Sequence, residues 1–89
     1  MKAVITVIGQ DRVGIIAAVS GCLAECNVNI LDITQTTMQG MFTMIMLTDI
    51  SGGTLPFAAI SEKLAELGGR IGMQISVQHE DIFNSMHRI

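Results

Sequence analysis

The sequence predicts a single α+β domain in which four strands form an antiparallel sheet and two helices cover one of its faces. Two observations lead to this fold class. Segments that alternate between apolar and polar residues are interleaved with two segments whose apolar residues recur at helical spacing. The two halves of the chain also resemble each other, because Ala17-Ala18 and Leu23-Ala24-Glu25 recur as Ala58-Ala59 and Leu64-Ala65-Glu66. We therefore expect two copies of one strand–helix–strand unit.

The first half of the chain predicts a strand, a helix and a second strand. Residues 2–9 alternate and are rich in β-branched side chains, which indicates the first strand. Apolar residues from Val13 to Cys26 recur at helical spacing, and Asn27 is a residue type that can end a helix. Residues 28–38 contain many Ile, Val and Thr, so they are predicted to form the second strand.

The second half predicts a third strand, a second helix and a fourth strand. Gln39-Gly40 is typical of a tight turn, and Met41 to Ile50 follows it as the third strand. Pro56 fits the first turn of the second helix. Gly68-Gly69 is expected to end that helix, since glycine is common just after a helix. Residues 71–79 alternate cleanly and are predicted to form the fourth strand.

This βαββαβ order predicts a ferredoxin-like sandwich. Right-handed crossovers place both helices on one face of the sheet and give the strand order 4-1-3-2. The third strand is apolar on both faces, because Phe42, Met44 and Met46 alternate with Ile45 and Leu47. Since a central strand that is apolar on both faces is normally covered on both, we expect something to cover the face without helices.

The C-terminal residues 80–89 are a candidate for that cover. The domain is expected to occupy residues 1–89, with a core at 1–79 and a tail at 80–89. Four apolar residues of the tail share one side of a short helix, namely Ile82, Phe83, Met86 and Ile89. Because so short a helix is unstable alone, the tail is expected to dock on this chain or on a second copy.

Composition and charge exclude several classes of protein. The formal net charge is -3 and no basic stripe is present, so binding to nucleic acid is not expected. No apolar run approaches the roughly 20 residues of a transmembrane helix, and the start lacks a signal-peptide pattern, so a cytoplasmic location is expected. Cys22 and Cys26 share a helix face and are interpreted as reduced core residues; a metal pair is the alternative, and no metal or cofactor is predicted.

The segment Gly9-Gln-Asp-Arg-Val-Gly14 joins the first strand to the first helix and is the strongest candidate for a site. It is not a nucleotide loop, because Ile15-Ile16 replace the Lys and Ser/Thr that such loops need. A helix N-terminus favours a carboxylate, and Asp11 offers a negative charge to an ammonium group. Together they could bind a free amino acid. The alternative is that Asp11 caps the helix and that Arg12 is only solvated.

Two stretches carry a resemblance to a known family: Asp11-Arg-Val-Gly-Ile-Ile-Ala-Ala-Val-Ser and Leu23-Ala-Glu-Cys-Asn-Val-Asn-Ile-Leu-Asp-Ile33. They resemble the ACT domain, and the chain is similar to small stand-alone ACT proteins of bacteria and archaea. It is also similar to the ACT segments of formyltetrahydrofolate-hydrolysing enzymes and of glycine-cleavage regulators. The resemblance implies a βαββαβ domain that pairs with a second copy through the second strand and the first helix.

The resemblance also implies a ligand site shared by two copies. It assigns to this site Asp11, Arg12, Val13, Gly14 and Ile15 of one copy, with Asn29 and Ile30 of the other. An amide such as Asn29 can donate a hydrogen bond to a carboxylate and accept one from an ammonium group. Gly9 and Val13 depart from residues common in amino-acid-binding members, which leaves the identity of the ligand open.

The hypothesis that follows is a non-enzymatic regulatory module, without catalytic residues, that binds an amino acid or similar small effector and acts on a separate protein. Three alternatives stay open. One is a structural dimerisation module without a ligand. Another is an acylphosphatase-like enzyme that uses Arg12, although the phosphate-binding glycine pattern is missing. The third is a metal-binding protein that uses Cys22 and Cys26.

Overall fold

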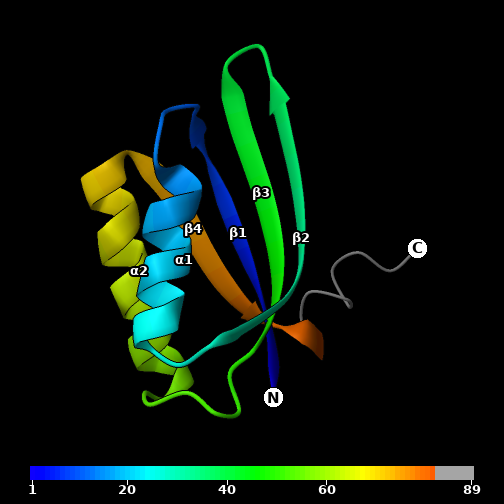
Figure 1. Ribbon diagram of the computed structural model, residues 1–89, viewed down its shortest axis with the longest axis vertical. Coiled ribbons are helices and arrows are strands. Elements are labelled where there is room, and N and C mark those ends of the chain that lie inside the picture. The colour runs from blue at the N-terminus through cyan, green and yellow to red at the C-terminus, as the bar shows by residue number, and fades with distance from the viewer. Residues whose placement is uncertain (82–89) are drawn as a thin grey trace.

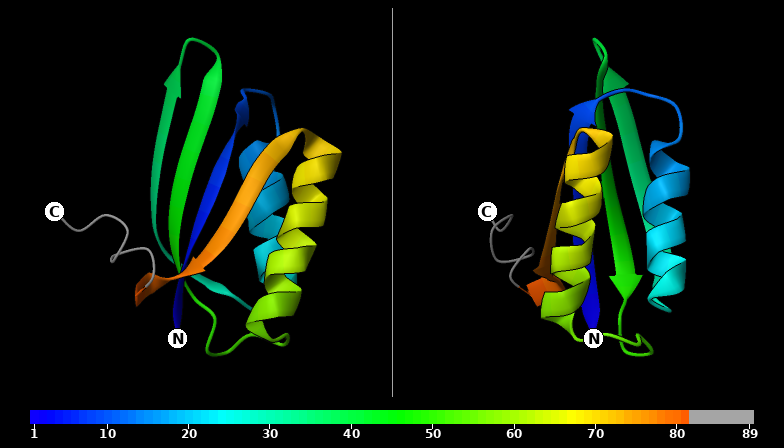
Figure 2. Two further views of the ribbon diagram at one scale, coloured as in Figure 1. Left: turned by 180° about the vertical axis from the view of Figure 1, so that it is seen from behind. Right: turned by 90° about the vertical axis from the view of Figure 1, so that its left-hand side faces the viewer.

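The computed structural model describes residues 1–81, which form the expected βαββαβ order (Figure 1). The elements are β1 (Lys2–Gln10), α1 (Ile15–Glu25), β2 (Asn29–Met38), β3 (Met41–Asp49), α2 (Phe57–Ile71) and β4 (Met73–His79). The sheet is antiparallel throughout with the order β2-β3-β1-β4, which is the predicted order read from the other edge. Both helices lie on one side of it, as Figure 2 shows. The predicted fold class is confirmed.

Helix α1 begins later than predicted and ends as predicted. Its first residue is Ile15 rather than Val13, because Gly14 has a φ of 91° and lies in the left-handed region. At the other end Asn27 has a φ of 57°, and its backbone N–H donates to the carbonyl of Ala24 at 3.0 Å. The N–H of Val28 donates to the carbonyl of Leu23 at 2.9 Å. These two bonds form the Schellman pattern, which satisfies carbonyls that the helix end leaves without partners.

Helix α2 contradicts one prediction, because it does not end at Gly68-Gly69 but continues to Ile71. Gly72, with a φ of 72°, ends it in the left-handed region, and β4 accordingly starts at Met73 instead of Ile71. Gly68 has a packing role instead. A Cβ atom on Gly68 would lie 2.6 Å from the carbonyl oxygen of Met73. The absence of a side chain therefore lets α2 pack closely against β4.

The hydrophobic core lies between the helices and the sheet. Strands β1 and β3 contribute alternate side chains to it, and each helix contributes one apolar stripe. Thr48 is the buried polar residue of this layer, and its hydroxyl donates to the carbonyl oxygen of Ala3 at 2.9 Å. Fully buried members of the core include Ile5, Val7, Val19, Leu23, Met44, Met46, Ile60 and Leu64.

The face of the sheet opposite the helices is apolar in its centre. Ile8 and Ile45 are exposed there to 41% and 37% of their surface. This agrees with the alternation expected for the third strand, and no element within residues 1–81 packs on this face. The tail that was expected to cover it falls outside the described residues from position 82 onwards.

Strand β2 lies at the edge of the sheet and is exposed along almost its whole length. Leu31 and Ile33 are exposed to 44% and 42% of their surface. The register with β3 is irregular between Ile30 and Asp32, which indicates a bulge at Leu31. Among the described residues β2 pairs with β3 alone. A long exposed edge strand of this kind is a surface on which another strand can pair.

Candidate functional site

The segment at residues 11–14 is held at the upper end of β1 (Figure 1). The backbone N–H of Asp11 donates to the carbonyl of Gly40 at 2.8 Å, which ties the segment to the turn between β2 and β3. Gly14 then turns the chain into α1, since its positive φ is strained for residues with a side chain. The local sequence thus fixes where α1 begins.

The N-terminus of α1 has free hydrogen-bond donors. Its first intrahelical bond runs from the N–H of Ala18 to the carbonyl of Gly14, at 2.9 Å. Neither Asp11 nor any other described side chain caps the helix, and its first turn holds no acidic residue. The amides of Ile15, Ile16 and Ala17 therefore point out of the helix end toward solvent. Asp11 does not cap the helix in the structure, so the alternative in which capping is its only role is wrong.

A surface hollow of about 320 Å³ opens beside these amides, between α1 and the sheet. Asp11 lines it from the loop and Gln35 lines it from β2. The other lining residues are Arg12, Gly14, Ile15, Ile16, Ala17 and Phe42. The hollow thus combines a carboxylate, a side-chain amide and the positive end of a helix dipole. These groups complement the ammonium and carboxylate groups of an amino acid.

Gln35 was not among the residues chosen from the sequence. It lies two positions after Ile33 on the helix-facing side of β2, because both pair with helix-facing residues of β3. A polar side chain at an inward position of an apolar strand is the signal that could have identified it. The residue types of this strand, which include many Thr, do not by themselves distinguish such a position from a solvated one.

Arg12 takes part in the packing of the fold. Its Nη1 donates to the carbonyl oxygen of Ile71 at 2.9 Å, at the C-terminal end of α2. A cation at this position is stabilised by the helix dipole. Arg12 also borders a second hollow of about 220 Å³, together with Val13, Gly14, Ile15, Arg70 and Ile71. The interpretation of Arg12 as a merely solvated residue is therefore incomplete, since it links the loop to α2.

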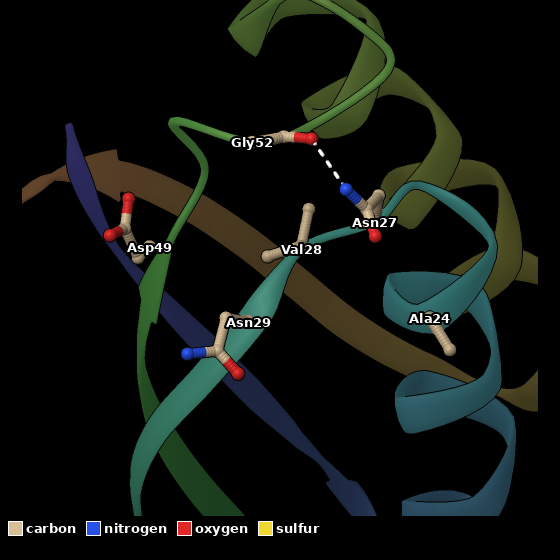
Figure 3. Close-up of a pocket in the computed structure, with 6 residues that line it drawn as sticks. All are labelled: Ala24, Asn27, Val28, Asn29, Asp49 and Gly52. Carbon is tan, nitrogen blue, oxygen red and sulfur yellow. Dashed lines mark hydrogen bonds between the residues drawn. The ribbon is translucent and has the colours of Figure 1, made fainter.

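Asn29 and Ile30 lie at the end of the sheet opposite to the loop at residues 11–14. Asn29 is in register with Asp49, at the end of β3, whereas the loop follows the far end of β1. The structure therefore brings the five loop positions together but does not bring the two β2 positions to them within one chain. Asn29 lines a hollow of about 490 Å³ at its own end of the fold (Figure 3), with Ala24, Asn27, Val28, Asp49 and Gly52.

The hollow around Asn29 is already organised by internal hydrogen bonds. The amide nitrogen of Asn27 donates to the carbonyl oxygen of Gly52 at 2.7 Å, as the dashed line in Figure 3 marks. The backbone N–H of Ser51 donates to Asp49 Oδ1 at 2.9 Å. Hydrogen bonds from the side chain and backbone of Ser51 lower the pKa of the Asp49 carboxyl. Asp49 is therefore an ionised turn residue at neutral pH.

The cysteines are both free thiols, with Cys26 buried in the core and Cys22 half-buried. Burial, together with the neighbouring Cys26, raises the pKa of the Cys22 thiol. Within residues 1–81 no group of three His, Cys, Asp or Glu side chains is placed to hold a metal ion. No helix of this part of the chain is both long and apolar enough to cross a membrane.

Comparison with known proteins gives consistent matches over the whole fold. The family model described as "ACT domain" matches residues 2–78. A UPF0237 protein of Clostridium perfringens is 62% identical over 89 residues, with 100% of both chains covered. A UPF0237 protein of Methanocaldococcus jannaschii is 54% identical over 88 residues, with 99% of this chain and 98% of the other covered.

Solved structures agree with these matches. An ACT domain protein from Streptococcus pneumoniae superimposes with a TM-score of 0.82 at 38% identity, and 93% of each chain is covered. The regulatory subunit of aspartate kinase from Thermus thermophilus superimposes with a TM-score of 0.69 at 26% identity, with 89% of this chain and 51% of that one covered. A putative glycine cleavage system transcriptional repressor gives a TM-score of 0.74 at 25% identity, with coverages of 89% and 47%.

Proposed function

This chain belongs to the ACT domain family, and from that premise we propose that it is a non-catalytic regulatory module that binds an effector between two copies of itself. The effector is a free amino acid or a small molecule with the same ammonium and carboxylate groups. The family is typically regulatory, and two of the structural neighbours are a regulatory subunit and a putative repressor. A cytoplasmic location and a separate regulated protein stay predictions from the sequence.

The observation that carries this proposal is the pairing of opposite charges around one hollow. The free amides at the start of α1 attract a carboxylate, and Asp11 attracts an ammonium group on the same side of the loop. Gln35 can donate to the first group or accept from the second. An effector with only one of the two charges would leave either the helix end or Asp11 without a counterpart.

In this proposal the two copies contact each other through their β2 strands. Two antiparallel β2 strands related by a two-fold axis would place the beginning of one strand beside the later half of the other. Asn29 and Ile30 begin β2, and Gln35 lies in its later half beside the hollow. Such pairing would therefore bring the partner's Asn29 to the hollow and would cover the exposed Leu31 and Ile33. This supports a site that is complete only in the dimer.

Thermal unfolding in the presence of each of the twenty amino acids at millimolar concentration tests the proposal. A ligand at about 100 times its Kd adds about 2.7 kcal/mol of stability, and that raises the Tm of a domain of this size by roughly 10–20 °C. Asp11→Asn and Asn29→Ala should each abolish the shift. Glu66→Gln is the matched control, because it removes one negative charge on the exposed side of α2. It should leave the shift unchanged.

The same experiment separates the proposal from a dimerisation module without a ligand. The exposed edge strand β2, with its exposed Leu31 and Ile33, supports self-association in both cases. If no amino acid shifts the Tm while sedimentation still gives a dimer, the ligand part of the proposal is wrong and the dimerisation part stands. If the protein sediments as a monomer near 9.5 kDa at micromolar concentration, the shared site is wrong.

A further inference from the structure

We propose that the effector carries a negatively charged side chain, so that it is an acidic or an O-phosphorylated amino acid. This rests on the proposed function and adds the chemical class of the effector to it. The class follows from the hollow of about 220 Å³ that Arg12 borders beside the end of α2. This hollow adjoins the one that Asp11 and Gln35 line, because Arg12, Gly14 and Ile15 border both.

The hollow beside α2 carries positive charge without a negative partner. Arg12 and Arg70 line it, and no acidic residue among those that the structure describes lines it with them. Neither arginine takes part in an ion pair within residues 1–81. Two of the five Lys and Arg residues are thus gathered at one small hollow in a chain whose formal net charge is -3. Because the two cations repel each other, an anion between them is stabilised by both.

Stabilisation of the end of α2 accounts for only one of these arginines. The helix dipole favours a cation near a helix C-terminus. Arg12 already occupies this position, since its Nη1 donates to the carbonyl oxygen of Ile71 at 2.9 Å. The side chain of Arg70 makes no hydrogen bond or ion pair with the rest of residues 1–81. Its guanidinium group is therefore available to a ligand, together with the N–H groups of Arg12 that Ile71 does not use.

The charges around the loop match an amino acid with an anionic side chain group for group. In the hollow toward β2, the free amides of α1 would bind the main carboxylate and Asp11 would bind the ammonium group. The way from there to the arginines is open, because a Cβ atom on Gly14 would meet no described atom within 4 Å. A side-chain carboxylate or phosphate suits the arginines, since it can accept two hydrogen bonds from one guanidinium group.

An amino acid with a neutral side chain lacks this last contact. It leaves both guanidinium groups to solvent, so the hollow discriminates between effectors by charge. Hydrogen bonds to charged groups are stronger than those between neutral groups. Arg12 and Arg70 are both exposed, however, and solvent weakens ion pairs at such positions. The expected preference for the charged effector is therefore about five- to tenfold in Kd.

Calorimetric titration at low salt tests this with pairs of ligands that differ in the charge of the side chain. The pairs are glutamate with glutamine, aspartate with asparagine, and O-phosphoserine with serine. In at least one pair the charged member should bind about five- to tenfold more tightly than the neutral member. The pair that shows the preference distinguishes a carboxylate from a phosphate.

Substitutions on α2 assign the preference to the hollow. Arg70→Gln should remove most of it, because one guanidinium group is lost while Arg12 keeps its contact with Ile71. Arg70→Lys keeps the positive charge and should retain part of it. Lys63→Gln is the matched control, since it removes an exposed positive charge from the same helix outside the hollow. It should leave the preference unchanged, and thermal unfolding without ligand checks that each variant is folded.

The outcomes separate the class of the effector from the proposed function. If both members of every pair bind equally, or if the preference persists in Arg70→Gln, the arginines do not select the side chain and the proposed function stands. The same holds if none of these ligands binds while another amino acid shifts the Tm in the thermal screen. If no amino acid binds at all, the class of the effector and the proposed function are both wrong.

Discussion

Replacing Gly68 by alanine should destabilise the protein, although Gly68 lies inside a helix. Glycine to alanine in a helix interior ordinarily gains about 0.5–1 kcal/mol. Here the new Cβ atom would lie 2.6 Å from the carbonyl oxygen of Met73 and 3.2 Å from Cγ1 of Ile75. The first of these atoms is backbone and cannot rotate away, so α2 must move from β4. Overpacking of this kind costs about 1–3 kcal/mol, and we expect a net loss of about 1–2 kcal/mol.

Gly69 supplies the matched control on the same helix. It is exposed, its φ is not positive, and a Cβ atom there would meet nothing within 4 Å. Gly69→Ala should therefore stabilise the protein by about 0.5–1 kcal/mol. The two neighbouring substitutions differ only in what the added methyl group contacts.

The assay is thermal unfolding of both variants at one fixed protein concentration, since association would make the Tm depend on concentration. For a domain of this size a change of 1 kcal/mol shifts the Tm by roughly 4–8 °C. Gly68→Ala should fall by about 4–16 °C and Gly69→Ala should rise by a few degrees. If both variants gain stability, the close packing of α2 on β4 is not what Gly68 provides.

Three further predictions concern other contacts of the fold. Thr48→Val should cost about 1 kcal/mol, because it removes the buried hydrogen bond to the carbonyl of Ala3, and urea unfolding measures this. Asn27→Ala should cost about 1 kcal/mol more than Asn27→Gly, because both lose the side-chain hydrogen bond to Gly52 and only alanine is strained at a φ of 57°; a Tm loss of equal size in both would contradict this. The lowered pKa of Asp49 means that its bonds with Ser51 add stability above the ordinary carboxyl pKa. The Tm difference between wild type and Asp49→Asn should therefore shrink as the pH falls through the lowered pKa, whereas a constant difference would refute the assignment.

The fold was predictable because its signals are local and repeated. Alternation in the strands β1 and β4, and helical spacing from Ile15 onwards, each follow from which face is buried. The end of α1 was predictable as well, since Asn27 is one of the few residue types that tolerate a left-handed conformation. These features depend on neighbours in the sequence, so a single sequence carries them.

The end of α2 was not predictable in the same way. A glycine pair is typical of a helix end, but Gly68 is present because β4 approaches the helix there. That approach depends on tertiary packing between segments, and no local pattern reports it. The same limit applies to Gln35, whose position beside Asp11 depends on how β2 passes α1. For Asn29, the proposed contact with the loop depends on a second copy.

Mixing two defective variants tests the central proposal, a site shared by two copies, most directly. Chains with Asp11→Ala and chains with Asn29→Ala are each titrated calorimetrically with the amino acid found in the thermal screen, alone and after unfolding and refolding together. Each variant alone should not bind. In the mixture, each mixed dimer combines an intact loop from one chain with an intact β2 from the other, so binding should return at about one quarter of the wild-type number of sites. If the mixture binds no more than the separate variants do, the effector is not held between two copies.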